Sequence, residues 1–278
     1  MRKIAIALIT LFVASIAAAQ SPAPPDYEIY AIKYATIQKF PLKALIKDAD
    51  PNKAIDIAMM FWLIRAPRKN ILVDAGFYRH NLFANWDIVD YVRPDDALAH
   101  FGVKPDEVTD IILTHGHWDH ADGGDLFPNA TYWMQKEEYR YYTVDAWQPG
   151  GKPGGIEPDD AMFWVAANTK GKMRLVEGDK EILPGIRVYI GGRHTFASQY
   201  VTVDTKNGAV VLASDNVYLY ENLDKHLPIA QTWDEKSNLA AQDKMKTLVK
   251  DQRLIVPGHD PQVMTRFPKV ADNVVKIE

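Results

Sequence analysis

The sequence predicts an α+β fold, in which two mixed β-sheets pack together and helices flank them. Two observations support this prediction. Segments rich in β-branched and aromatic residues occur in both halves of the chain, and stretches with helical spacing of apolar residues lie between them. The sequence has no 20–50-residue repeat signature and no low-complexity tract. We therefore expect residues 20–278 to form a single domain.

The first 19 residues have the organisation of a secretory signal peptide. A basic start, Arg2-Lys3, precedes an apolar run from Ile4 to Ile16, and Ala17-Ala18-Ala19 fits the small-residue pattern of a cleavage site. A retained membrane anchor is the alternative, but the apolar run is shorter than the ~20 residues that a membrane-spanning helix needs. We expect cleavage after Ala19, export to the periplasm or the medium, and a mature chain that is not held in a membrane.

Composition excludes several classes of protein. Hydrophobic residues make up 47% and charged residues 24% of the chain, as in ordinary globular proteins. The net charge of −4 argues against a nucleic-acid partner. The chain has no cysteine, which excludes disulfides, thiol nucleophiles and iron–sulfur clusters. An exported protein without disulfides must be stabilised by its hydrophobic core or by a bound metal.

In the first half of the chain, short strands precede and follow a helical region. The expected strands lie at residues 27–37, 57–65, 71–73 and 110–113. The expected helical regions lie at residues 84–101, divided in two near Pro94, and at residues 135–147. Residues 148–158 are rich in glycine and proline and are expected to form a long loop.

The second half repeats this order of strands and helices. The expected strands lie at residues 174–176, 186–190, 200–204, 209–213 and 253–256, the last being the final strand. Lys206-Asn207-Gly208 supplies the residues of a hairpin turn. Residues 234–251 have the apolar spacing of a helix.

A dense group of metal-binding residue types follows the buried strand at residues 110–113. The segment from His115 to His120 reads His-Gly-His-Trp-Asp-His, which places three histidines and a carboxylate within six residues. Imidazole and carboxylate groups are suitable zinc ligands, and a loop leaving a strand can bring several of them to one point. A surface histidine cluster is the alternative, but the preceding strand supplies the structural context of a real motif.

Three further candidate ligands, His194, Asp215 and His259, each come after a predicted strand. With the four residues of the motif they make seven, too many for one tetrahedral zinc and suited to two metals. Two metals that share a carboxylate can hold a bridging hydroxide at neutral pH, which is a nucleophile for hydrolysis. The other histidines are expected to be structural or surface residues: His80, His100 and His226.

The order of these residues resembles the metallo-β-lactamase superfamily. Asp74-Ala75-Gly76 also matches the early Asp-x-Gly of that family, which supports the metal-binding loop. The resemblance extends from about Tyr27 to Phe267 and implies an αββα sandwich. It also implies one metal on His115, His117 and His194, a second on Asp119, His120 and His259, and Asp215 bridging the two.

Within the superfamily, the sequence is most similar to the quorum-quenching N-acyl homoserine lactone lactonases. The similarity lies in residues 176–186, in Asp215-Asn216-Val217-Tyr218, and in the segment from Val256 to Asp260. It implies that a metal-bridging hydroxide opens a lactone ring. Tyr218 would then hydrogen-bond the carbonyl oxygen, and Asp119 would assist proton transfer to the leaving alkoxide. A packed aromatic is the alternative role for Tyr218.

Residues 195–199 depart from the usual lactonase sequence after the third histidine, so we expect a different pocket wall there. Five aromatic residues are candidates to line an apolar pocket for an acyl chain, with a place in the core as the alternative: Phe77, Trp86, Trp118, Phe196 and Tyr218. The loop at residues 148–158 is a candidate lid or dimer contact, and a homodimer is left open.

Two other functions remain as alternatives to a lactonase. One is a different dinuclear hydrolase of the same superfamily, such as a β-lactamase, phosphodiesterase or thioesterase. The other is a metal-binding module without turnover. The expected cofactors are two divalent ions, with Zn²⁺ as first choice and iron, cobalt or manganese as alternatives. The expected partner is a small-molecule lactone or ester.

Overall fold

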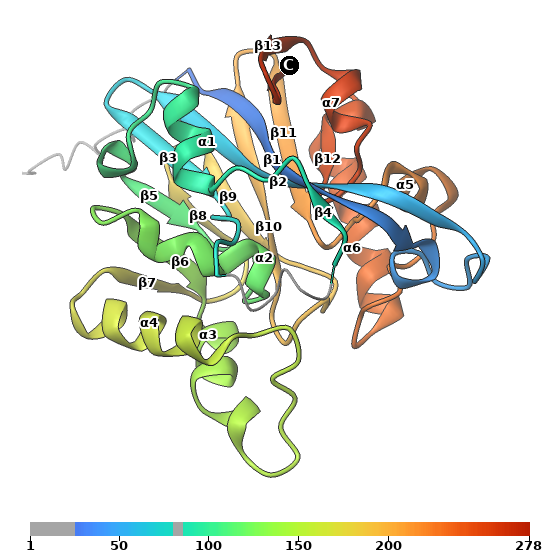
Figure 1. The fold of residues 1–278 in the computed structure, drawn as a ribbon, viewed down its shortest axis with the longest axis horizontal. Coiled ribbons are helices and arrows are strands. Elements are labelled where there is room, and N and C mark those ends of the chain that lie inside the picture. Colours follow the sequence, from blue (N-terminus) through green and yellow to red (C-terminus); the bar gives the residue numbers. More distant parts are fainter. Residues whose placement is uncertain (1–25, 80–85) are drawn as a thin grey trace, which may run out of the picture.

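The computed structural model describes residues 26–79 and 86–278, which form four layers in the order helix, sheet, sheet, helix (Figure 1). The predicted signal peptide and His80 lie outside the described residues. Across the described ranges, none of the helices is both long enough and apolar enough to span a lipid bilayer.

The larger sheet has the strand order β13-β14-β1-β2-β3-β5-β6-β7, and β4 pairs with β1. Its strands are β1 (Glu28–Pro41), β2 (Ala54–Ala66), β3 (Lys69–Val73), β4 (Ile88–Val89), β5 (Asp110–Ile112), β6 (Thr131–Gln135), β7 (Met173–Val176), β13 (Lys269–Ala271) and β14 (Val274–Ile277). The pairs β3–β5, β5–β6 and β6–β7 are parallel, while β1, β2 and β3 are antiparallel neighbours. The sheet is therefore mixed, as predicted.

The smaller sheet has the order β12-β11-β10-β9-β8. Its strands are β8 (Lys180–Leu183), β9 (Ile186–Ile190), β10 (Gln199–Thr205), β11 (Gly208–Ser214) and β12 (Ile255–Pro257). Only β11 and β12 run parallel among the pairs of this sheet in the described chain.

The helices form the two outer layers. They are α1 (Pro94–His100), α2 (Trp118–Ala121), α3 (Lys136–Thr143), α4 (Pro158–Thr169), α5 (Tyr220–Lys225), α6 (Glu235–Leu248) and α7 (Val263–Arg266). In Figure 1, α1, α3 and α4 lie on one side of the strands, and α5, α6 and α7 lie on the other.

Strand β2 shows how the sequence produces these layers. Side chains of a strand point alternately to opposite faces, so a strand that is buried on both faces is apolar throughout. In β2, Phe61 and Leu63 pack with α1 and α4 residues, while Trp62 and Ile64 pack between the sheets against β9, β10 and β11. A third cluster joins the outer face of the smaller sheet to α5 and α6. The predicted αββα fold is confirmed.

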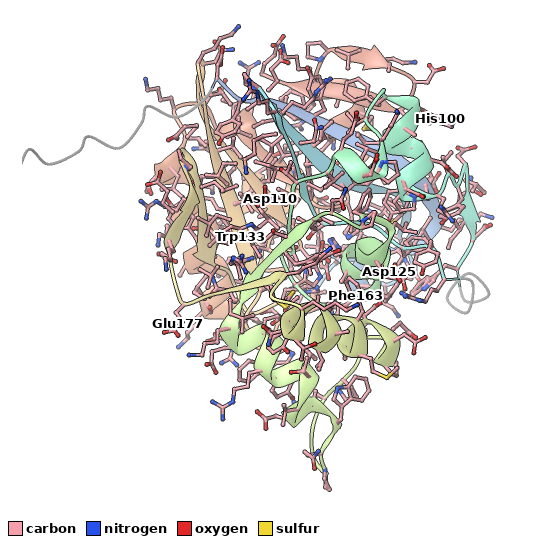
Figure 2. The ribbon with its side chains drawn as sticks, turned by 90° about the vertical axis from the view of Figure 1, so that its left-hand side faces the viewer. His100, Asp110, Asp125, Trp133, Phe163 and Glu177 are labelled. Carbon is pink, nitrogen blue, oxygen red and sulfur yellow. The ribbon has the colours of Figure 1, made fainter. Side chains whose placement is uncertain are left out.

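The predicted helical region at residues 84–101 is wrong in its first part. The helix begins only at Pro94, and residues 88–89 form strand β4 against β1. The residue before a proline is pushed out of the helical region, and Arg93 is extended, with a ψ of 138°. Trp133 on β6, a strand that the sequence did not indicate, donates to Asp110 on β5 at 2.9 Å; Figure 2 labels both residues.

Two further differences concern the loop at residues 148–158 and the end of the chain. The loop ends at Glu157, because Pro158 occupies the first position of the unpredicted helix α4, where a missing N–H costs nothing. The strand predicted at residues 253–256 is not the final one. Strand β14 follows it and pairs with β1, where Val274, Val275 and Ile277 become buried.

Candidate metal centre

The seven candidate ligands come from four separate loops that meet at one edge of the sandwich. His115 follows β5, and His117, Asp119 and His120 lie at the start of α2. His194 lies between β9 and β10, Asp215 directly follows β11, and His259 comes just after β12. The structure brings all seven together in two groups that share Asp215, and within each group the ligand atoms lie within 4.8 Å of one another.

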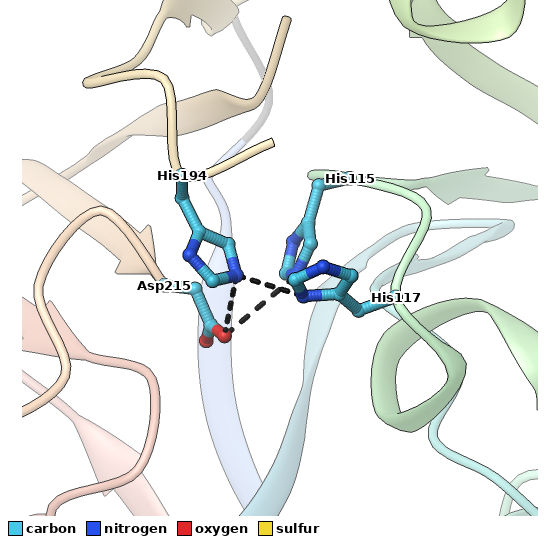
Figure 3. Close-up of side chains that lie close together, drawn as sticks. All are labelled: His115, His117, His194 and Asp215. Atoms are coloured by element: carbon cyan, nitrogen blue, oxygen red, sulfur yellow. Dashed lines mark hydrogen bonds and ion pairs between the residues drawn. The ribbon is translucent and has the colours of Figure 1, made fainter. Parts of the chain in front are cut away.

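The first group contains His115, His117, His194 and Asp215 (Figure 3). The His194 Nε2 atom lies 2.8 Å from His117 Nδ1 and 3.2 Å from Asp215 Oδ2. The His115 Nε2 atom lies 3.6 Å from the same Asp215 oxygen. Three ring nitrogens and one carboxylate oxygen therefore face a common point.

The second group contains Asp119, His120, His259 and Asp215. Asp215 Oδ1 lies 3.2 Å from His120 Nε2 and 3.0 Å from His259 Nε2. Asp119 Oδ2 lies 3.4 Å from His120 Nε2 and 3.6 Å from His259 Nε2. Asp215 thus turns one oxygen to each group, which is the geometry of a bridging ligand.

Hydrogen bonds outside the two groups orient the histidine rings. The Nδ1 atom of His194 donates to the Gln231 carbonyl oxygen at 2.8 Å, and that of His259 donates to the Ala58 carbonyl oxygen at 3.2 Å. His120 Nδ1 donates to Asp74 Oδ2 at 2.8 Å. With the proton held on Nδ1, the lone pair of Nε2 faces the site, as a metal ligand requires.

Asp74 connects this site to the strands beneath it. It is fully buried, and its carboxylate accepts hydrogen bonds from the Thr114 amide at 2.8 Å and from the Ser214 hydroxyl at 3.0 Å, besides His120. These donors adjoin His115 and Asp215 in the sequence. Two positions after Asp74, Gly76 has a φ of +68°, and a Cβ atom there would lie 2.8 Å from the Pro94 ring. This position therefore requires glycine.

The chemistry of the donor atoms fits a pair of cations. Within the described chain, the buried atoms His115 Nε2, His120 Nε2 and Asp215 Oδ1 form no hydrogen bond. Buried polar atoms without a partner are rare in proteins and call for an explanation, such as a bound ion. A set of imidazole and carboxylate donors without thiolates is also typical of catalytic rather than closed structural zinc sites.

Protonation differs between the two groups when no metal is bound. Burial lowers the pKa of His117 to about 3 and holds that of His115 well below its usual value, so both rings are neutral. Burial also acts against charge on His120, but Asp215, Asp119 and Asp74 outweigh it and hold its pKa well above the usual value. The pKa of His259 is raised in the same way, chiefly by Asp215. The carboxylates around the second group therefore favour positive charge there.

A cavity of about 290 Å³ lies beside the two groups. Asp119, Asp215 and His259 line its polar side. The apolar side is formed by seven residues: Ile37, Phe40, Leu45, Ile57, Met59, Trp86 and Trp118. A cavity of this kind, apolar with a few polar groups at one end, is typical of small-molecule sites.

Of the five predicted pocket aromatics, Trp86, Trp118 and Tyr218 line this cavity. The other two do not. Phe77 is fully buried in the core with its ring 4.7 Å from that of Trp118, and Phe196 stacks on Tyr141 at 4.2 Å. Sequence reasoning missed the wall from β1 and β2, since their apolar residues read equally well as core.

Tyr218 has features of both of its predicted roles, a group that acts in the site and a packed aromatic. Its side chain lines the cavity, yet it is almost fully buried, and its hydroxyl lies 3.3 Å from His194 Nδ1. Burial, reinforced by Asp215, raises the pKa of Tyr218 well above its usual value, so the phenol keeps its proton and can donate a hydrogen bond.

The glycine-rich loop packs on the metal-binding loop. Gly154 and Gly155 line the cavity, and the Gly155 carbonyl oxygen accepts from the Trp118 amide at 2.9 Å. A Cβ atom on Gly155 would lie 2.5 Å from the His117 ring, so only glycine fits there.

His226 pairs with Asp243 at 3.0 Å on the surface, and the exposed His100 lies on α1 (Figure 2), as expected.

Comparison with known proteins gives a consistent picture. The profile of the metallo-beta-lactamase superfamily matches residues 60–259. N-acyl homoserine lactonase from Bacillus cereus is 26% identical over 225 residues, which cover 76% of this chain and 84% of that protein.

Solved structures share the fold. One is an N-acyl homoserine lactone hydrolase with the product N-hexanoyl-L-homoserine bound at the catalytic metal centre; its TM-score is 0.72 at 21% identity, covering 91% of this chain and 100% of the other. Another is AidC, described as a dizinc quorum-quenching lactonase, with a TM-score of 0.66 at 17% identity, covering 86% and 89% of the two chains.

Proposed function

The chain belongs to the metallo-β-lactamase superfamily, and we propose that this metallo-hydrolase opens the lactone ring of N-acyl homoserine lactones or closely related lactones. The observation that carries the proposal is the position of Asp215, with one oxygen toward each histidine group, beside a cavity with an apolar wall and Tyr218. The relatives named as N-acyl homoserine lactonases support the choice of substrate.

The dinuclear centre of the superfamily would be held here by His115, His117 and His194, by Asp119, His120 and His259, and by Asp215 between them. Two divalent ions bound there supply an activated water and a Lewis acid for the carbonyl group. We propose zinc, because imidazole and carboxylate donors suit it and a structural relative is described as dizinc. Iron, cobalt and manganese accept the same donors.

Tyr218 and Asp119 would act directly on the substrate. The protonated phenol of Tyr218 can donate to the carbonyl oxygen of the lactone as negative charge develops there. Burial opposes ionisation of Asp119, but positive charge on the second group lowers its pKa, so a cation held there would keep Asp119 a carboxylate. As the water oxygen bonds to the carbonyl carbon and the ring C–O bond breaks, Asp119 can accept the proton of the water and pass it to the leaving oxygen.

A pH-stat assay on N-acyl homoserine lactones of short and long acyl chain tests this function. We expect the zinc-loaded protein to release acid from these lactones, and Asp215→Ala to release none, because it removes the ligand common to both groups. The same preparations are tested on a chromogenic cephalosporin, a phosphodiester and a thioester. Rapid cleavage of one of these, with lactones left intact, would contradict the lactonase and favour another hydrolase of the superfamily.

We also propose that residues 1–19 direct export and are removed, on the strength of the basic, apolar and small-residue segments at the N-terminus. Mass spectrometry of the periplasmic or secreted protein is then expected to show an N-terminus at Gln20. A full-length chain retained in the cytoplasm would refute this.

A further inference from the structure

Glu138 on α3 is a buried carboxylate. It belongs neither to the sequence motifs nor to the metal-binding groups described above. Its side chain is 0% exposed, although glutamate is among the residues that are almost never fully buried unless paired. Its carboxylate accepts three hydrogen bonds: Oε1 from the Gly116 amide at 3.0 Å and from the Thr195 hydroxyl at 2.6 Å, and Oε2 from the Ala197 amide at 2.6 Å.

These three donors belong to two loops that are far apart in the sequence. Gly116 lies between His115 and His117, and Thr195 directly follows His194. One carboxylate therefore connects the loops that carry all three histidines of the first group. The second group has a different support, since His120 is held by Asp74.

We propose that Glu138 is a positioning residue that sets the distance between the His115–His117 loop and the His194 loop, and thereby the metal affinity of the first group. Burial raises the pKa of Glu138, but both of its oxygens accept hydrogen bonds, which favour the ionised form. Hydrogen bonds from amides and hydroxyls to a charged carboxylate are short and stronger than neutral ones. Groups that orient metal ligands typically change metal affinity by about 10–100-fold when they are removed. The proposal depends on the dinuclear centre of the superfamily and is independent of which substrate is hydrolysed.

The substitution Glu138→Gln keeps the shape of the side chain and removes one acceptor. If the amide oxygen of glutamine faces Gly116 and Thr195, its NH₂ group faces the Ala197 amide. If it is turned over, the NH₂ group faces the Gly116 amide. In either orientation a buried backbone N–H in a ligand loop loses its acceptor, so the loops must separate or shift.

The test measures zinc affinity, by competition with a chromophoric chelator, in two backgrounds that each leave one group complete. In His259→Ala, which preserves the first group, we expect Glu138→Gln to weaken zinc binding by about 10–100-fold. In His194→Ala, which preserves the second group, we expect a change within about twofold, because Glu138 contacts none of its members. Glu137→Gln, on the exposed neighbour of Glu138, is the matched control and should change neither affinity.

An unchanged affinity in the His259→Ala background, or equal losses in both backgrounds, would overturn the proposal, the latter because it indicates general destabilisation. If circular dichroism shows that Glu138→Gln does not fold, Thr195→Val takes its place. That variant removes one donor and keeps the carboxylate, and the same contrast between backgrounds is expected with a smaller loss. Because no substrate is used, failure of the lactonase proposal would leave this result interpretable.

Discussion

Replacing Asp74 by asparagine should impair the second metal group while leaving the shape of the site intact. Asp74 Oδ2 accepts a hydrogen bond from His120 Nδ1 at 2.8 Å, and Asp74 Oδ1 accepts one from the Thr114 amide at 2.8 Å. Asparagine has a single acceptor oxygen. If that oxygen stays on the Thr114 amide, the NH₂ group faces His120 Nδ1, which must then accept. The proton of His120 moves to Nε2, where it blocks the lone pair that faces the metal.

The expected loss is about 10–100-fold in zinc affinity for the second group, or about 1.4–2.7 kcal/mol. The stability of the metal-free protein should also fall by about 1.5–3 kcal/mol, the usual contribution of a hydrogen bond to a charged group. Zinc titration against a chelator, with metal content per chain, measures the first effect, and urea unfolding measures the second.

The control for this experiment is Asp272→Asn, because the side chain of Asp272 is 98% exposed. We expect that control to bind two zinc ions as the parent does. Two tight zinc ions in Asp74→Asn, with unchanged stability, would show that the tautomer of His120 is not set by Asp74 and would refute the reasoning.

Three other outcomes follow from the structure. The pKa values of His120 and His259 are raised, so zinc must displace protons from these two residues when it binds. The zinc affinity should therefore fall as the pH falls through these pKa values. A zinc affinity that does not depend on pH would contradict this. Phe40→Ala shortens the apolar wall and should lower kcat/KM for long-chain lactones by about tenfold relative to short-chain ones; equal effects would place the acyl chain elsewhere. Trp164→Ala should cost about 3–5 kcal/mol in urea unfolding because this side chain is fully buried, whereas Met162→Ala, on the exposed side of the same helix, should cost less than about 0.5 kcal/mol.

The layers of the fold could be read from the sequence where a pattern is local and strong. The apolar strand at residues 57–65 and the helix at residues 234–251 were recognisable because a run of β-branched and aromatic residues, or helical spacing, depends only on neighbouring residues. Helix α4 was missed because apolar residues occur on several of its sides: Trp164 is buried, while Met162 and Val165 are exposed. Such a helix lacks the single apolar face on which prediction relies.

The sequence by itself determined the chemistry of the site. The spacing from His115 to His120 places four potential ligands in one loop after a strand, and covalent connectivity alone keeps them close. The later ligands were predicted because each follows a strand, and the structure brings all of them together.

Only the tertiary structure decided how those ligands are held and what lies beside them. Three features depend on contacts between segments that are remote in the sequence. Asp215 turns one oxygen to each group, Glu138 connects two distant loops, and Phe40 and Met59 form a cavity wall. A buried glutamate or an apolar strand residue has the same local pattern whether it supports a site or only the core. The role of such a residue depends on the loops that contact it in the folded protein. Those contacts follow from the packing of the two sheets, which is a property of the whole chain.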